Sequence, residues 1–110
     1  RLRYINDEPI VLTNTYLPSH LVPGLEKMEL SQSSLYEVLE KNFNVVITRG
    51  RRIIGATVAN EYQAGLFKIK SGDPLIVINN ITYSVNDVPI EYYHGLYRGD
   101  RNIFEVEMIR

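Results

Sequence analysis

Reactive side chains gather in the segment 88–104, which reads VPIEYYHGLYRGDRNIF and combines two acids and three tyrosines with a histidine and two arginines. If the segment is a strand, its side chains alternate between two faces. One face carries Glu91, Tyr93, Gly95 and Tyr97. The other carries Ile90, Tyr92, His94 and Leu96. An ordinary edge strand does not need so many polar and aromatic side chains, so we expect one face to be buried and the other to line a site.

A second group of candidates lies at the start of the chain. Arg1 and Arg3 are two residues apart, so in a strand both guanidinium groups leave the same face and can converge on one anion. The alternative is a solvated edge strand whose arginines discourage aggregation. The pair therefore predicts a phosphate clamp only if other anion-binding groups join it.

Such groups are expected at the start of a helix over residues 32–43. The sequence Ser34-Leu35-Tyr36-Glu37 matches a capping box and makes Ser34 the N-cap. The unpaired N–H groups of the first turn attract anions, and Tyr36 stands beside them. The alternative for Ser34 is capping alone, without ligand binding.

Other polar clusters have structural explanations. The arginines at 49, 51 and 52 flank Gly50 without interleaved aromatics, which favours a solvated bulge over a nucleic-acid patch. His20 and His94 are far apart and the chain has no cysteine, so zinc has weak support.

The segment 98–101 also has a structural explanation. Asp100 lies at a turn between Arg98 and Arg101, where an ion-pairing carboxylate that holds the turn is the usual reason. Together with Glu91 it does not have the spacing of a glycosidase acid pair. No P-loop or nucleophile-elbow sequence occurs, and we find no catalytic constellation, cofactor motif or metal site.

The surrounding pattern predicts strands interrupted by two helices. Asn6 to Pro9 and Asn86-Asp87 are expected to be hairpin turns. The expected strands cover residues 1–5, 9–17, 45–59, 75–85, the candidate segment itself and 102–109, and the expected helices cover 32–43 and about 60–67. This order predicts an α+β domain in which helices pack against a mostly antiparallel sheet.

Length and composition set broad limits. The 110 residues suffice for one domain, which we expect to occupy 1–110, and a net charge of −1 gives no overall attraction for nucleic acid. The absence of cysteine fits a reducing cytoplasm, and no apolar run is long enough to span a bilayer. The chain begins with Arg-Leu-Arg and no methionine, so we expect it to be a fragment.

Five short motifs in order carry a family resemblance: RLRY-x-NDEP, TYLP, SSLYEVL, GDPLIVI and PIEYYHGLYRGDR. Together they resemble the effector-binding UTRA domain of the HutC subfamily of GntR-family transcription regulators, over essentially the whole chain. The resemblance implies a chorismate lyase-like fold, a homodimer and an N-terminal winged helix-turn-helix that is absent from this chain and contacts DNA.

The resemblance also implies a function. Members of the family bind a small metabolite, often a phosphorylated sugar, and thereby change DNA affinity. Carried over by position, the phosphate clamp falls on Arg1, Arg3, Ser34 and Tyr36. Glu91 and Tyr97 match positions that hold the polar body of the ligand, with Tyr93 on the same face.

Thr13 departs from the pattern, because this position is commonly a glutamate that accepts from the ligand. A threonine supplies no charge there, which weakens the analogy to an amino-sugar phosphate. Two alternatives remain open: an enzyme related to chorismate lyase and a purely structural dimerisation module.

Overall fold

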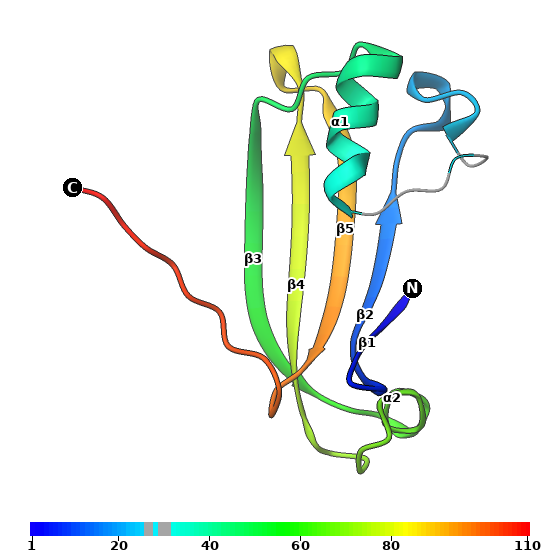
Figure 1. Cartoon of the computed structure of the whole chain (residues 1–110). Coiled ribbons are helices and arrows are strands. Elements are labelled where there is room, and N and C mark those ends of the chain that lie inside the picture. Colours follow the sequence, from blue (N-terminus) through cyan, green and yellow to red (C-terminus); the bar gives the residue numbers. More distant parts are fainter. Residues whose placement is uncertain (26–27, 29–31) are drawn as a thin grey trace. The chain divides into compact units, whose positions relative to one another are not determined.

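The chain folds into a five-stranded antiparallel sheet with two α-helices in the part that the structure describes (Figure 1). The computed structural model describes residues 1–25, 28 and 32–110, with the backbone alone for 32–34. The sheet order is β1-β2-β5-β4-β3. The strands are β1 Leu2–Ile5, β2 Glu8–Tyr16, β3 Arg49–Val58, β4 Pro74–Tyr83 and β5 Pro89–Arg98. The helices are α1 Gln32–Phe43 and α2 Glu61–Phe67. The predicted α+β class is confirmed.

Two hairpin turns join neighbouring strands as the sequence predicts. Asn6 and Asp7, between β1 and β2, have φ values of 50° and 63°. Asn86 and Asp87, between β4 and β5, have φ values of 62° and 56°. Positive φ at both central residues gives a two-residue turn the twist that the flanking strands need, and Asn and Asp tolerate it better than most residues.

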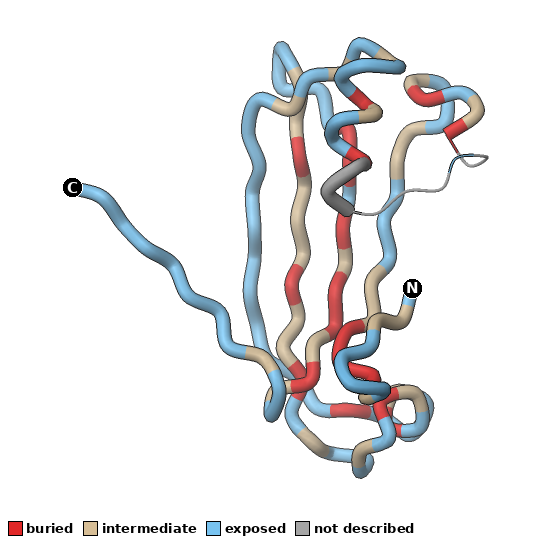
Figure 2. The backbone as a smooth tube through the Cα atoms, in the orientation of Figure 1, coloured by how far each residue is buried: buried red, intermediate tan, exposed pale blue. Residues whose placement is uncertain are grey.

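The chain forms two compact units, and Figure 2 shows the buried residues of each. Unit 1 comprises residues 1–14, 54–78 and 94–110, and unit 2 comprises residues 15–53 and 79–93. Each unit has its own cluster of buried apolar side chains and its own helix. Ligand candidates are therefore assigned to one unit or the other.

Unit 1 packs α2 against its strands. Asn60 caps α2 by accepting a hydrogen bond from the Gln63 backbone N–H, and the Gln63 side chain accepts from the Asn60 N–H in return. This reciprocal capping satisfies two N–H groups that the helix leaves without a partner. The core of unit 1 consists of Ala59, Ala64, Phe67, Leu75 and Leu96.

Unit 2 packs α1 over the strand ends that belong to it (Figure 1). Leu35 and Leu39 are one helical turn apart, so they share the face of α1 that is buried. They join the core of unit 2, which also contains Val22, Leu25 and Ile90. Tyr36, which follows Leu35, is thereby placed at the border of the buried face.

The predicted N-cap at Ser34 is wrong. The helix already includes Gln32, so Ser34 lies within the first turn rather than before it, and its side chain lies outside the described part of the chain. The capping box also requires Glu37 to reach back toward Ser34. Glu37 instead accepts a hydrogen bond from Lys41 one turn later, at 2.6 Å.

The strand predicted over residues 102–109 is also wrong. These residues have no strand pairing, and Ile103 and Ile109 are each 96% exposed. The local sequence has the β-branched residues of a strand, but strand geometry persists only where backbone groups pair with a neighbour. Within the described residues none pairs with this segment. The strand predicted from Val45 likewise begins later, at Arg49.

Candidate functional site

The most unusual polar group in unit 2 is the carboxylate of Glu91 on β5. Its side chain is nearly inaccessible, because Glu91 is only 2% exposed. Oε1 accepts hydrogen bonds from the hydroxyl of Tyr36 at 2.7 Å and from the hydroxyl of Thr82 at 3.4 Å. Oε2 is also buried, and it has no hydrogen-bond partner among the described residues.

An unpaired buried oxygen is costly. Leaving a buried acceptor without a donor costs about 1–3 kcal/mol, and more when the group is charged. Tyr36 approaches from α1 and Thr82 from β4, so both sides of the unit help to position Glu91. The unused oxygen is thus a buried acceptor whose hydrogen-bonding capacity the described residues leave unfilled.

A polar cavity lies beside this group. It has a volume of about 260 Å³ and is lined by Tyr36, Gly50, Arg51, Arg52, Asn80 and Thr82. Tyr36 and Thr82 are the two residues that donate to Glu91. The cavity therefore places hydroxyl, amide and guanidinium groups next to a buried carboxylate, an arrangement suited to a small polar molecule.

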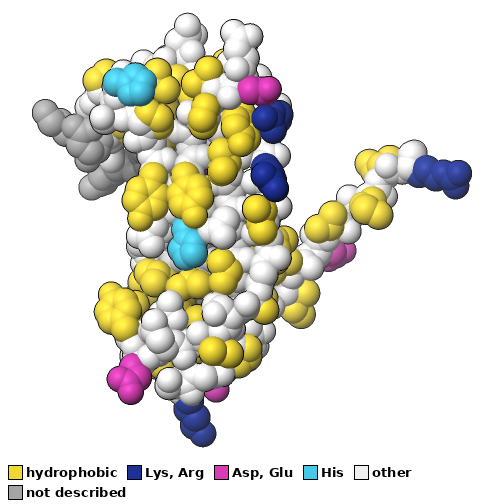
Figure 3. Space-filling model, turned by 180° about the vertical axis from the view of Figure 1, so that it is seen from behind, with side chains coloured by type: hydrophobic (Ala, Val, Ile, Leu, Met, Phe, Trp, Pro, Cys, Tyr) yellow, Lys and Arg dark blue, Asp and Glu magenta, His cyan; other side chains and the backbone are white. Residues whose placement is uncertain are grey.

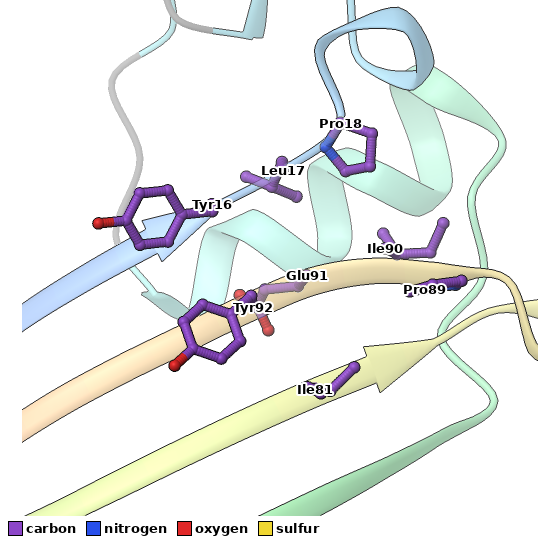
Figure 4. Close-up of a pocket in the computed structure, with 8 residues that line it drawn as sticks. All are labelled: Tyr16, Leu17, Pro18, Ile81, Pro89, Ile90, Glu91 and Tyr92. Carbon is purple, nitrogen blue, oxygen red and sulfur yellow. The ribbon is translucent and has the colours of Figure 1, made fainter.

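A second cavity of about 310 Å³ is mainly apolar and is drawn in Figure 4. Tyr16 and Tyr92 lie on the near side of β2 and β5 in this view, and α1 lies behind these strands. Their rings are tilted, with centroids 6.0 Å apart. Figure 3, which views the molecule from the side opposite to Figure 1, shows hydrophobic side chains (yellow) at the surface of that face. The other lining residues are Leu17, Pro18, Ile81, Pro89, Ile90 and Glu91.

Two of the residues predicted to form the phosphate clamp, Arg1 and Arg3, lie in unit 1. The backbone N–H of Thr13 donates to the carbonyl of Arg1 at 2.7 Å, and the amino terminus of Arg1 donates to Thr13 in return. Arg1 and Thr13 are therefore directly opposite each other, and Arg3 shares their face by alternation. The Nε of Arg3 is buried and has no hydrogen-bond partner among the described residues.

The remaining predicted ligand residues are distributed between the units. Tyr36 and Glu91 are in direct contact in unit 2, and Tyr93 is buried in the same unit. Tyr97 belongs to unit 1, where its ring packs edge-on against Phe104 with centroids 5.1 Å apart. The structure therefore assembles two subsets, one around Arg1 and one around Glu91.

Arg98 confirms the prediction that the segment 98–101 holds a turn. Arg98 is 7% exposed and donates to both carboxylate oxygens of Asp100, at 3.0 and 2.8 Å. It also donates to Glu8, which accepts from Arg101 as well. The hydrogen bond from Arg98 lowers the pKa of Asp100, and the same bond raises the pKa of Arg98.

Several lining residues of the polar cavity were not predicted. Arg52 was interpreted as part of a solvated bulge, and Asn80 and Thr82 were not singled out. The available signal was the sequence of β4, in which polar residues interrupt an apolar central strand, LIVINNITY. A polar side chain on a covered strand needs a partner, so such an interruption points to a polar site.

Among the described residues, no three His, Cys, Asp or Glu side chains are grouped so that they could hold a metal ion. None of the described helices is long and apolar enough to cross a membrane.

An antiparallel sheet with packed helices, a polar cavity, and a buried carboxylate that accepts hydrogen bonds from two residues lining that cavity is typical of a small-molecule-binding α+β domain. The family model of the UTRA domain matches residues 1–102, and the chain belongs to this family. It is similar to a solved GntR-family transcriptional regulator from Enterococcus faecalis V583, with a TM-score of 0.83 and 29% identity over 97% of this chain and 76% of that one.

Curated relatives are longer than this chain. The HTH-type transcriptional repressor NagR of Bacillus subtilis is 30% identical over 94% of this chain and 42% of its own length. A probable fructoselysine utilization operon transcriptional repressor of Escherichia coli K12 is 25% identical over 92% of this chain and 42% of its own length. The chain thus spans about two fifths of these relatives.

Proposed function

We propose that this chain is the effector-binding domain of a transcription regulator, that it is not an enzyme, and that its effector is a small anionic metabolite, a phosphorylated sugar. The observation that carries the proposal is the buried Glu91, whose Oε2 lacks a donor among the described residues. A sugar hydroxyl supplies such a donor. The names of NagR and of the fructoselysine repressor, both transcriptional repressors, support the regulatory role.

The anionic part of the proposal rests on the arginines of β1 and its amino-terminal end. The family resemblance assigns the phosphate to Arg1 and Arg3, and the unpaired Nε of Arg3 supports this assignment. Hydrogen bonds to charged groups contribute about 1.5–3 kcal/mol each, so two guanidinium groups provide much of micromolar affinity. Glu91 then distinguishes among sugars through their hydroxyl groups.

Binding is transmitted, in this proposal, through Tyr36. Its hydroxyl joins α1 to β5 through the hydrogen bond to Glu91. A ligand that donates to the same carboxylate changes the strength of this hydrogen bond and thereby the position of the start of α1. A coupling of about 1–3 kcal/mol between effector and DNA sites alters DNA affinity several-fold to about a hundredfold. The DNA contacts belong to a winged helix-turn-helix domain outside this chain.

Homodimerisation is part of the same proposal, and β3 supports it. All ten residues of this edge strand are exposed, including the apolar Ile53, Ile54 and Val58. An exposed edge with apolar side chains favours pairing with a second copy about a two-fold axis. Sedimentation velocity is expected to show a dimer that Ile54→Lys weakens.

The binding proposal is tested by thermal shift against a panel of phosphorylated sugars. One compound is expected to raise the melting temperature, and Arg3→Ala is expected to abolish that rise without unfolding the domain. Lys70→Gln, which removes a positive charge from an exposed position, serves as the control. A panel without any stabilising compound would contradict the proposal, as would conversion of chorismate to 4-hydroxybenzoate by the protein.

A further inference from the structure

The arginines of this chain differ in how their charge is balanced. Arg49 donates to Asp87 at 2.7 Å, and Arg98 and Arg101 pair with acidic residues in unit 1. By contrast, Arg51 and Arg52 form no ion pair within the described residues. Both line the polar cavity, whose lining contains no acidic residue. The two guanidinium groups outnumber the single buried carboxylate of Glu91 behind Tyr36 and Thr82, so the cavity keeps a net positive charge and is suited to an anion.

Arg52 is held in place at this cavity. Its Nε donates to Oδ1 of Asn80 at 2.8 Å, which fixes the side chain while the two terminal nitrogens of the guanidinium keep their donors. A guanidinium that is already oriented loses less entropy when it binds a carboxylate with two parallel hydrogen bonds. The Asn80 contact thus prepares Arg52 for a planar anion.

Arg52 also shares a sheet face with the Glu91 group. A Cβ at Gly50 would lie 3.6 Å from Cγ2 of Thr82, so residues 50 and 82 face the same side. Arg52 lies two residues beyond Gly50 and contacts Asn80, two residues before Thr82, so alternation places all four on that side. Thr82 itself donates to Glu91. A ligand in the cavity therefore meets Arg52 and the donors of Glu91 together.

We propose that Arg52, oriented by Asn80, is a subsite within unit 2 for a carboxylate on the effector, so that the effector is a sugar acid rather than a neutral sugar. The proposal rests on the proposed function, because it assigns this cavity to the same effector. Gly50 lines the cavity without a side chain, and a larger residue there takes up space beside Thr82.

The first test uses malonate, which carries carboxylates and no phosphate. In an NMR titration, malonate is expected to shift the amide signals of Gly50, Asn80 and Thr82. Arg52→Gln is expected to abolish these shifts, and Lys70→Gln to preserve them. Absence of shifts, or shifts that persist in Arg52→Gln, would overturn the subsite.

The second test compares 6-phosphogluconate with sorbitol 6-phosphate, which differ only in a carboxylate against a hydroxymethyl group. Calorimetry is expected to show about tenfold tighter binding of 6-phosphogluconate. Arg52→Gln is expected to remove this preference while sorbitol 6-phosphate binds as before, and Gly50→Val to weaken 6-phosphogluconate. A preference that survives in Arg52→Gln would refute the subsite.

The two tests together separate the subsite from the proposed function. If malonate shifts the cavity signals and neither phosphate compound binds, the phosphorylated-sugar function fails and the carboxylate subsite stands.

Discussion

Arg98 and Glu91 are both charged, both buried and both on β5, yet their surroundings are opposite. In unit 1, Arg98 donates to Glu8 and to both oxygens of Asp100. In unit 2, Glu91 receives donors on Oε1, whereas Oε2 has none among the described residues. The guanidinium of Arg98 is thus paired with two carboxylates of the protein, whereas the carboxylate of Glu91 is hydrogen-bonded through one of its two oxygens.

The difference separates a structural role from a binding role. A buried charge with a full set of partners stabilises a particular arrangement, as Arg98 does where β5 meets the turn at Asp100. A buried acceptor without a donor costs free energy in the folded state, and a ligand that supplies the donor recovers that cost. The comparison therefore predicts that substitutions at Arg98 change stability, whereas substitutions at Glu91 mainly change binding.

The largest effect is expected from Arg98→Met. Removing the guanidinium leaves the carboxylates of Glu8 and Asp100 with the half-exposed Arg101 as their remaining shared cation, and both carboxylates are partly exposed, so water moderates the loss. We expect the free energy of unfolding to fall by about 2–4 kcal/mol, measured by urea denaturation. Arg101→Gln is the control, because Arg101 is half exposed and its removal is expected to cost under about 1 kcal/mol. Equal losses in the two variants would contradict the structural role assigned to the buried Arg98.

Much of the fold was predictable from local sequence. The turns at Asn6-Asp7 and Asn86-Asp87 have local signals, because only a few residue types tolerate positive φ. The segment 102–109 was misjudged since strand formation depends on a pairing partner, and residue types alone do not reveal one. Ser34 was misplaced because Glu37 has a competing partner, Lys41, one turn further on.

The site was likewise predictable only where local sequence patterns identify its residues. Alternation along β5 and the family motifs pointed to Glu91, and the contact with Tyr36 is consistent with that prediction. Neither signal identified Arg52, because its contact with Asn80 joins residues that are distant in sequence. Whether a given arginine is paired with an acid depends on the tertiary structure, so Arg49 and Arg52 look equivalent in the sequence and differ in the fold.

Tyr36→Phe tests the surroundings of Glu91, and its expected effect on stability is smaller than that of Arg98→Met. The substitution removes the 2.7 Å donor to Glu91 and leaves Oε1 with the longer bond from Thr82. Since Tyr36 is 38% exposed, water replaces part of the interaction, and we expect a loss of about 1 kcal/mol in the free energy of unfolding. Thermal denaturation of Tyr36→Phe beside Tyr62→Phe, an exposed tyrosine, isolates the effect. Equal melting temperatures would show that the bond adds nothing to stability.

Glu91→Gln is expected to change stability by less than about 1 kcal/mol. The amide oxygen still accepts from Tyr36 and Thr82, although more weakly, while the uncompensated charge disappears. These changes oppose each other, so urea denaturation is expected to show little net effect, whereas affinity for the stabilising phosphorylated sugar is expected to fall about tenfold. A loss of stability as large as that of Arg98→Met would mean that Glu91 has a structural role, and the contrast between the two units would fail.

The smallest effect concerns the titration of Asp100. The hydrogen bond from Arg98 lowers the folded-state pKa below the ordinary value of 3.8, so the carboxylate stabilises the folded state at higher pH. That contribution is lost as pH falls from 3.8 through the lower, folded-state pKa. It is modest, because the Asp100 side chain is 48% exposed. Carbon-detected NMR is expected to show Asp100 titrating below 3.8 in the native protein and at a higher pH in Arg98→Met, where Arg101 alone still lowers the pKa of Asp100. Titration at the ordinary value in both proteins would mean that Asp100 does not compensate the charge of Arg98, and the buried guanidinium would then depend on Glu8.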